Sequence, residues 1–348
     1  LRQTLSKKTI AFNELLQWLE KNGLIFHGPF LYHEQQGPLL PLRLDYGYCR
    51  DENLVFPAKC VSCDYLFDGF TGFTRAILEE IAQIQLSSGA KYTTFEIPAY
   101  VCPRCRRASK QVHDLYAPPR EALDRVGGVL DSDKYTELRT IVKRSVFPGI
   151  CLDRVQKTVV PGYFYQAEWV EYERHYFFLH VVNQTSSIQL ESICDTLIQL
   201  GAKGKSAQLT CLDPWNFDKY YEMLTSKNLQ DAARKIQDKG VFDLILLTPT
   251  IFTLRDRCLS LPPEALSTEP LSNTTDPLTR LLQNGDIVLH GFALGRPVEV
   301  SGWDSSKQAP REMYLAVPPG SVLRFKIQSS LNIIEQMIKP MMLENVGK

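Results

Sequence analysis

Two pairs of cysteines have the spacing of a metal-binding knuckle. Cys60 and Cys63 form one C-x-x-C pair, and Cys102 and Cys105 form the second. Two thiolates spaced in this way reach one metal ion from a tight turn, and four complete the tetrahedral shell of zinc. We predict a structural zinc ion held by these four cysteines, because four thiolates leave no position open for a catalytic water. The alternative is a group of buried, reduced thiols.

A helix must separate the two knuckles if they are to meet. Apolar residues recur every three or four positions between Gly72 and Gly89, which predicts a helix that ends at the second glycine. The zinc-binding insertion is therefore expected over residues 58–108. The other cysteines are expected to be small core residues: Cys49, Cys151, Cys194, Cys211 and Cys258.

Basic residues gather in two places where they could contact phosphate groups. One is a glycine and lysine loop, Gly201, Lys203, Gly204, Lys205 and Ser206. Glycine lets the backbone approach a phosphodiester closely, and lysine supplies the charge. The other is a cluster after the second knuckle that includes Arg144, Arg154 and Lys157. The alternative for both is a solvated surface, with the glycine loop acting only as a turn that ends a helix.

Signatures of enzymes are scarce in this sequence. It contains no dinucleotide-binding G-x-G-x-x-G, no phosphate-binding G-x-x-x-x-G-K-[ST], no H-E-x-x-H and no G-x-S-x-G. His175, Tyr176 and His180 could supply an acid and a base for RNA cleavage, since histidine titrates near neutrality. His175 and His180 are five positions apart, however, and would face opposite sides of a regular strand. We therefore expect a protein without catalytic activity.

Length and composition indicate a folded protein of about two domains. The chain has 348 residues, 44% of them hydrophobic, with 39 basic and 39 acidic side chains. Because the net charge is zero, any nucleic acid must be bound by local basic patches. Neither a membrane-spanning run nor a signal peptide is recognisable, so we expect a cytoplasmic protein without a membrane partner.

Helical and strand-like segments are intermixed along the chain. Helices are predicted over residues 9–22, 187–200, 216–239, 277–284 and 330–338. Strands are predicted over residues 162–172 and 175–182, paired as an antiparallel hairpin, and over 241–248, 286–294 and 321–327. Regular alternation of strand and helix is missing, which favours an α+β fold over a doubly wound α/β fold.

The C-terminal part resembles a known family. Gly302-Trp303-Asp304, followed by the run Ala316–Phe325 (AVPPGSVLRF), resembles the repeat-associated RAMP subunits of type III CRISPR effectors. Within that family it is most similar to the subunit that caps the 5′ end of the guide RNA. Three further segments fit in order along the chain: the run Arg154–Tyr165, the glycine loop and the strand-like run Phe242–Pro249. The resemblance covers about half of the chain, and the inserted zinc finger fits type III-D relatives best.

This resemblance implies a fold and a function. It implies tandem ferredoxin-like domains related to RNA-recognition folds, with an N-terminal domain over residues 1–213 and a C-terminal domain over residues 214–348. It also implies a non-catalytic subunit of a prokaryotic ribonucleoprotein that acts in antiviral defence. This subunit would bind the 5′ handle of crRNA and cap an assembly of backbone RAMP subunits and a large polymerase-like subunit, with target RNA contacted only indirectly. The RNA-binding residues would be Gly201, Lys203, Gly204, Lys205, Ser206, Arg144, Arg154 and Lys157.

Two alternatives remain open from the sequence. The chain could be a metal-independent endoribonuclease that trims guide-RNA precursors, as some relatives of the capping subunit do. It could also be a backbone RAMP subunit that lies in several copies along the guide. The Trp303 to Ser321 signature favours the capping position over the backbone position.

Overall fold

The structure is a computed structural model in which most of the chain, but not all of it, is described. The described residues are 10–11, 17, 24–60, 98–123, 129–153, 155–172, 175–183, 196–200, 205–210, 234, 236–254, 257–262, 265, 277–304 and 309–327. Every structural statement below concerns these residues. No helix among them is long and apolar enough to cross a membrane.

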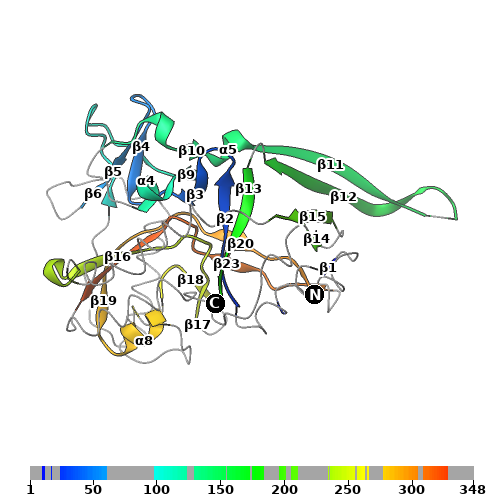
Figure 1. Ribbon diagram of the computed structural model, residues 1–348. Coiled ribbons are helices and arrows are strands. Elements are labelled where there is room, and N and C mark those ends of the chain that lie inside the picture. Colours follow the sequence, from blue (N-terminus) through cyan, green and yellow to red (C-terminus); the bar gives the residue numbers. More distant parts are fainter. Residues whose placement is uncertain are drawn as a thin grey trace.

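An antiparallel five-stranded sheet organises the N-terminal half (Figure 1). From edge to edge it contains β10 (Thr136–Glu137), β9 (Leu115–Ala117), β3 (Gly37–Pro41), β2 (Leu24–His33) and β13 (His175–Asn183). A second sheet contains β5 (Leu54–Pro57), β4 (Tyr46–Cys49) and β8 (Lys110–Gln111). Helix α4 (Pro119–Leu123) follows β9. Leu40, Tyr46 and Val55 are at most 1% exposed and belong to one apolar cluster, so the two sheets share a core.

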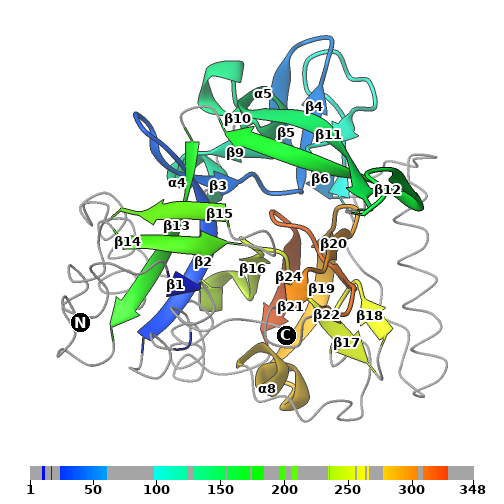
Figure 2. The ribbon, with the colours of Figure 1, turned by 90° about the vertical axis from the view of Figure 1, so that its right-hand side faces the viewer.

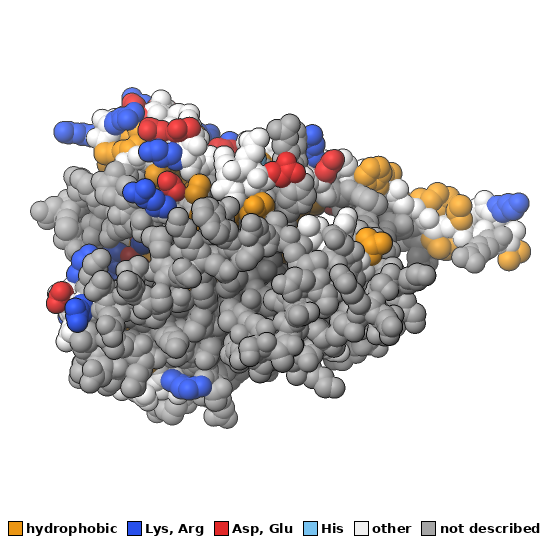
Figure 3. Space-filling view, viewed as in Figure 1, with side chains coloured by type: hydrophobic (Ala, Val, Ile, Leu, Met, Phe, Trp, Pro, Cys, Tyr) orange, Lys and Arg blue, Asp and Glu red, His pale blue; other side chains and the backbone are white. Residues whose placement is uncertain are grey.

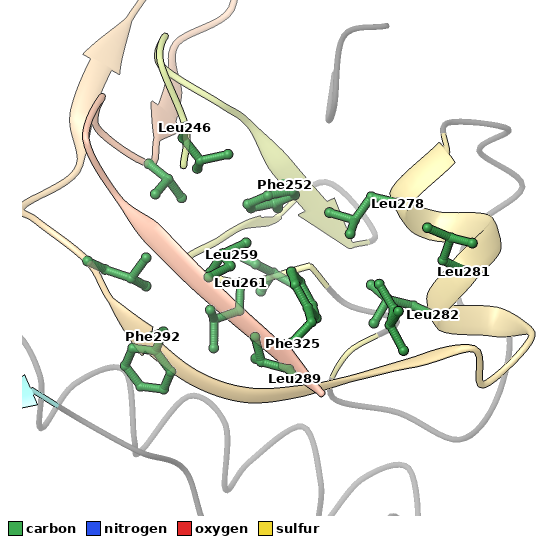
Figure 4. Packing of buried hydrophobic residues seen from close by; sticks show 14 residues of the cluster. Leu246, Phe252, Leu259, Leu261, Leu278, Leu281, Leu282, Leu289, Phe292 and Phe325 are labelled. Carbon is green, nitrogen blue, oxygen red and sulfur yellow. The ribbon is translucent and has the colours of Figure 1, made fainter. Parts of the chain in front are cut away.

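A separate core lies beneath a three-stranded sheet in the C-terminal half. This sheet contains β16 (Val241–Ile245), β24 (Val322–Ile327) and β19 (Ile287–Ala293), all antiparallel. Figure 4 shows Phe325 of β24 and Leu289 of β19 facing Leu278 and Leu282 of helix α8 (Pro277–Gln283). Short pairs of strands surround this core: β17 (Phe252–Leu254) with β18 (Arg257–Leu259), β20 (Val298–Val300) with β23 (Tyr314–Ala316), and β21 (Trp303–Asp304) with β22 (Ala309–Pro310).

A long two-stranded ribbon extends away from the rest of the chain (Figure 1). It contains β11 (Val142–Leu152) and β12 (Val159–Tyr172), paired from Val142 and Tyr172 at the base to Leu152 and Val159 near the tip. The 3-10 turn η1 (Ser132–Lys134) and helix α5 (Leu138–Ile141) precede it. In Figure 2 the ribbon points toward the viewer and is strongly foreshortened.

The remaining strands form two small units. One is the sheet β1 (Ile10–Ala11), β14 (Thr196–Leu200) and β15 (Lys205–Leu209), in which β1 is parallel to β14. The other is β6 (Lys59–Cys60) paired with β7 (Pro98–Ala99). The described residues are thus mostly β-strand with short helices, a larger strand share than the α+β prediction implied.

Several predicted elements are confirmed at their positions. Strands β16, β19 and β24 and helix α8 lie where hydrophobic patterns placed them. Of the helix predicted over 216–239, only residues 234 and 236–239 are described; they are helical, and the φ of +66° at Gly240 and its hydrogen bond to Ile236 mark the helix end. The predicted helices over 72–89 and 330–338 and the domain boundary at 213/214 lie outside the described residues.

Three local predictions are wrong. The strands at 162–172 and 175–182 exist, but they do not pair with each other: β12 pairs with β11, and β13 pairs with β2. The C-terminal end of the helix predicted over 187–200 is strand β14, and the start of the helix predicted over 9–22 is strand β1. In each case long-range pairing partners decide the structure, and a local sequence window does not contain them.

Candidate functional sites

The ribbon exposes apolar side chains along both of its strands. On one face, Val146 and Ile150 of β11 and Phe164 and Val170 of β12 are between 46% and 62% exposed. The register places Ile150 directly opposite Phe164. Figure 3 shows hydrophobic side chains on the surface of the projecting arm. Large apolar side chains gathered on a protrusion are typical of a surface that contacts another molecule.

Arg144 lies near the base of the ribbon and is exposed. Its guanidinium nitrogen is 3.4 Å from Glu168 Oε1 on the opposite strand. Since both side chains are solvent-exposed, this ion pair is weak, and it leaves the guanidinium accessible to a competing anion. Arg144 can therefore exchange its carboxylate partner for a phosphate without unfolding the ribbon.

The tip of the ribbon is a preformed turn that presents Lys157. Asp153 Oδ1 accepts hydrogen bonds from the backbone N–H groups of Val155 (2.7 Å) and Gln156 (3.0 Å). These two hydrogen bonds lower the pKa of Asp153 below its usual value, and the bond from Gln156 contributes more than the bond from Val155. Lys157 has a φ of +53°, and its N–H donates to the Asp153 carbonyl oxygen. These bonds order the turn and hold an exposed lysine at the far end of the ribbon.

Arg144 and Lys157, the two described ribbon residues among those predicted to bind RNA, are too far apart to contact the same phosphate. Arg144 is opposite Val170, whereas the last described pair before the tip is Leu152 and Val159. At about 3.3 Å per residue, the separation along the strand is roughly 25 Å. Arg144 and Lys157 are therefore two separate exposed cations, spaced for an extended chain of phosphates and not for a single phosphate. Arg154, the third predicted residue of this group, lies outside the described residues.

The glycine and lysine loop connects two strands and does not end a helix. Strands β14 and β15 pair with Leu200 opposite Lys205 and Gln199 opposite Ser206. Gly201, Lys203 and Gly204 lie outside the described residues, and only the backbone of Lys205 and Ser206 is described. The loop thus joins the strands of a β-hairpin, and the prediction that its lysines bind RNA stays a prediction.

The side chains of three cysteines lie close together at the end of β4, a strand of the smaller N-terminal sheet. The Sγ atoms of Cys49, Cys102 and Cys105 all lie within 4.8 Å of one another, a grouping that could hold a metal ion. Cys102 and Cys105 belong to the predicted site, whereas Cys49 was expected to be an ordinary core residue. Cys60 pairs through its backbone with Pro98, but its side chain and all of Cys63 lie outside the described residues.

The second C-x-x-C pair has the backbone geometry of a knuckle. The Cys102 carbonyl oxygen accepts from the Arg106 N–H, and the Cys102 N–H donates to the Arg107 carbonyl oxygen, at 2.9 and 3.0 Å. Arg106 takes a φ of +58° so that the chain reverses tightly after Cys105. Burial disfavours the Cys102 thiolate, but N–H groups of Cys105 and Arg104 aimed at its sulfur lower its pKa. The knuckle is therefore arranged to stabilise negative charge on sulfur.

Strand pairing brings Cys49 to this knuckle. β8 follows the knuckle and returns alongside β4, with Lys110 opposite Tyr48. Cys49 is the last residue of β4, so it lies beside the returning chain. A search for cysteine spacing misses it, because Cys49 and Cys105 are 56 positions apart and the partner strand β8 is only two residues long.

Comparisons with known proteins identify the family of the chain. No curated protein matches it. Two cryo-EM structures of the type III-B Cmr-beta complex bound to cognate target RNA contain similar chains, the second structure also containing AMPPnP. The two matched chains are 16% and 15% identical in sequence to this chain, and both have a TM-score of 0.38. The matches cover 92% and 91% of this chain and 70% and 72% of the matched chains. The family model described as CRISPR-associated protein (Cas_Cmr3) matches residues 117–340, which is more than half of the chain. The chain therefore belongs to the Cas_Cmr3 family and is a RAMP-like subunit of a type III CRISPR effector.

Proposed function

We propose that this chain is the non-catalytic subunit that binds the 5′ handle of crRNA and caps the backbone of a cytoplasmic type III effector, of subtype III-D. The observation that carries the proposal is the family match over residues 117–340. This range includes the whole ribbon and the β14–β15 hairpin, and so every predicted RNA-binding residue. The tandem ferredoxin-like architecture and the inserted zinc finger belong to the same proposal.

The ribbon supports RNA binding through the position of its charges. The chain has no net charge, so it has no general attraction for RNA. Arg144 and Lys157 instead present cations at two points along a protruding arm that exposes apolar side chains between them. Cations bind phosphates, and apolar surface can cover bases or a neighbouring subunit. We infer that the ribbon contacts crRNA and the adjoining backbone and polymerase-like subunits.

The experiment is to purify the assembled effector and sequence the RNA that it retains. Three preparations are compared: the native chain, Lys203→Glu/Lys205→Glu, and Lys157→Glu. The control is Lys134→Glu, an exposed lysine in η1 outside both candidate surfaces. The native particle is expected to retain short RNAs with a common repeat-derived 5′ handle. Particles with Lys203→Glu/Lys205→Glu or Lys157→Glu are expected to retain less RNA than the Lys134→Glu control. An intact particle that retains no RNA would refute the proposal.

Salt dependence gives a second measurement on the same particles. Each phosphate contact to single-stranded RNA lowers log K by about 0.7 for each tenfold rise in salt. Lys157→Glu should therefore reduce the slope by about 0.7 if Lys157 makes one phosphate contact. An unchanged slope would place Lys157 away from the RNA.

One observation favours endoribonuclease activity as a second candidate. Across β13 and β2, the backbone register pairs His175 directly with His33. The His33 ring is half-buried, and its Nδ1 accepts from the N–H groups of Gln35 and Gln36 at 3.3 and 3.2 Å, which leaves Nε2 to carry the proton. Metal-free cleavage of a guide precursor that is lost in both His175→Gln and His33→Gln would establish this activity. Cleavage that persists in either variant would exclude this pair.

A further inference from the structure

We propose that Cys49 is a zinc ligand and that Cys49, Cys102 and Cys105 provide three of the four thiolates of a structural site. The distance between Cys49 Sγ and Cys105 Sγ is 3.6 Å. A disulfide would require about 2.05 Å. Two sulfurs bound to one tetrahedral zinc at about 2.3 Å are separated by about 3.8 Å. The spacing is therefore that of two ligands on one ion.

The surroundings fit a closed structural site. Cys49 and Cys102 are 5% and 0% exposed, and both belong to an apolar cluster with Leu54 and Phe56. Cys105 and Val129 pack against this cluster. An apolar shell around thiolates excludes water and competing ligands, which strengthens binding and suppresses chemistry at the metal. The expected role of the ion is to hold the fold together.

Crowding of the sulfurs is costly without a cation. The Sγ atoms of Cys49, Cys102 and Cys105 lie within 4.8 Å of one another, so three thiolates in these positions would repel one another. A divalent cation offsets this repulsion, because it stabilises all three thiolates together.

With Cys49 as a ligand, the zinc ion would connect the insertion to another part of the chain. With ligands from the two C-x-x-C pairs alone, zinc would close only the insertion at residues 58–108. With Cys49, it also fastens the end of β4, a strand of the N-terminal core, to the knuckle. The exposed ion pair between Asp51 and Arg107 at 3.1 Å crosses between the same two segments. Zinc would therefore couple the insertion to the sheet that carries it.

One ligand position is left for the first C-x-x-C pair. The backbone of β6, which ends at Cys60, pairs with β7, and β7 leads into the knuckle. Five cysteines, Cys49, Cys60, Cys63, Cys102 and Cys105, thus compete for four positions. The ligands that the structure assigns are Cys49, Cys102 and Cys105, and the side chains of Cys60 and Cys63 lie outside the described residues.

Cobalt substitution of the purified chain tests this ligand set. Co²⁺ binds such sites in place of zinc, and its sulfur-to-metal charge-transfer absorption grows with the number of thiolates. The native chain is expected to bind one ion with four thiolates, and Cys49→Ser to lose about a quarter of the absorption or the ion itself. Cys151→Ser, at an exposed cysteine on the ribbon, is the matched control and should not change either quantity. Full metal content and full absorption in Cys49→Ser, together with half of the native absorption in the double variant described next, would overturn the proposal, because the unused cysteine of the first C-x-x-C pair could replace Cys49 in the single variant.

A double variant keeps the test decisive if Cys49→Ser does not fold. Cys60→Ser/Cys63→Ser retains three thiolates if Cys49 is a ligand, and two if the site consists of the two C-x-x-C pairs. Its charge-transfer absorption per bound cobalt is expected to be about three quarters of the native value. A value of one half, or a native chain that binds no metal, would refute the assignment. RNA retention by the particle is measured separately, so this result does not depend on the proposed function.

Discussion

The Arg43 guanidinium lies 2.5 Å from the carboxylate of Asp243, a residue 200 positions further along the chain. Arg43 also forms two bonds to Asp45, at 2.9 and 2.7 Å, and Arg324 forms two to Asp243, at 2.7 and 3.0 Å. Two cations and two anions thus alternate at the junction between the N-terminal sheets and β16 and β24 of the C-terminal core. The two halves of the chain are joined by this network.

Neighbouring backbone contacts extend this junction. The Leu44 N–H donates to the Gly320 carbonyl oxygen at 2.8 Å, and the Gln111 side chain donates to the Leu44 and Leu294 carbonyl oxygens. Gly320 belongs to the run Ala316–Phe325 that carried the family resemblance. That part of the signature therefore has a structural role: it holds the C-terminal half against residues 42–46.

Removal of Arg43 should strongly destabilise the protein. Burial opposes the charge on Arg43, but Asp45 and Asp243 raise its pKa and keep it protonated. In Arg43→Met the two carboxylates, with side chains 9% and 16% exposed, lose this cation. We expect the free energy of unfolding to fall by about 3–5 kcal/mol, measured by urea denaturation. Arg139→Met, at a surface pair with Glu137, is the control and should change little.

Acid should weaken the same junction. Burial alone would raise the pKa of Asp243, but hydrogen bonds from Arg324 and the charge of Arg43 lower it below its usual value. A lowered pKa stabilises the fold above the ordinary carboxyl pKa of about 3.9, and this contribution is lost as the pH falls through the lower, folded-state value. Stability should therefore decline below about pH 4, and less steeply in Asp243→Asn. An identical acid slope in both proteins, followed by denaturation at several pH values, would contradict this assignment.

Gly320 should tolerate no side chain. Its φ is +83°, and an added Cβ would overlap the Leu42 carbonyl oxygen and lie 3.5 Å from Leu44 Cγ. Gly162 in the ribbon has the same φ of +83°, but a Cβ added there would have no atom within 4 Å. A substitution at Gly162 therefore measures the cost of backbone strain without a steric clash. Gly162→Ala should cost about 1–2 kcal/mol of stability. Gly320→Ala should cost clearly more in thermal and urea unfolding, and equal losses would show that the junction can shift to make room.

Local patterns predicted which segments are strands better than they predicted how strands pair. The periodicity of residues 286–294 and 321–327 depends on burial against one core, and β19 and β24 form there as predicted. The strand over 162–172 also exists, but its partner β11 lies in a stretch that we considered only for its charges. Side-chain alternation shows that a strand has two faces and does not identify its neighbour.

The same limit explains why part of the cysteine site was missed. Spacing identifies Cys102 and Cys105, since both cysteines come from one turn. Cys49 reaches them only because β8 returns along β4, a pairing of two residues in each strand. When strand pairing brings two cysteines together, the number of residues between them in the sequence gives no indication that they share a site. Such ligands need a structure to be found.

The exposed face of the ribbon should contribute little to the stability of the free chain. Phe325 is fully buried and its ring lies 5.5 Å from that of Phe242, whereas Phe164 on the ribbon is 62% exposed. Phe325→Ala should cost about 3–5 kcal/mol, because it leaves a cavity in the C-terminal core. Phe164→Ala should change stability by no more than about 0.5 kcal/mol. If Phe164→Ala destabilised the free chain as much as Phe325→Ala, the ribbon would pack against the body, and it could not be the accessible arm on which the proposed RNA contacts depend.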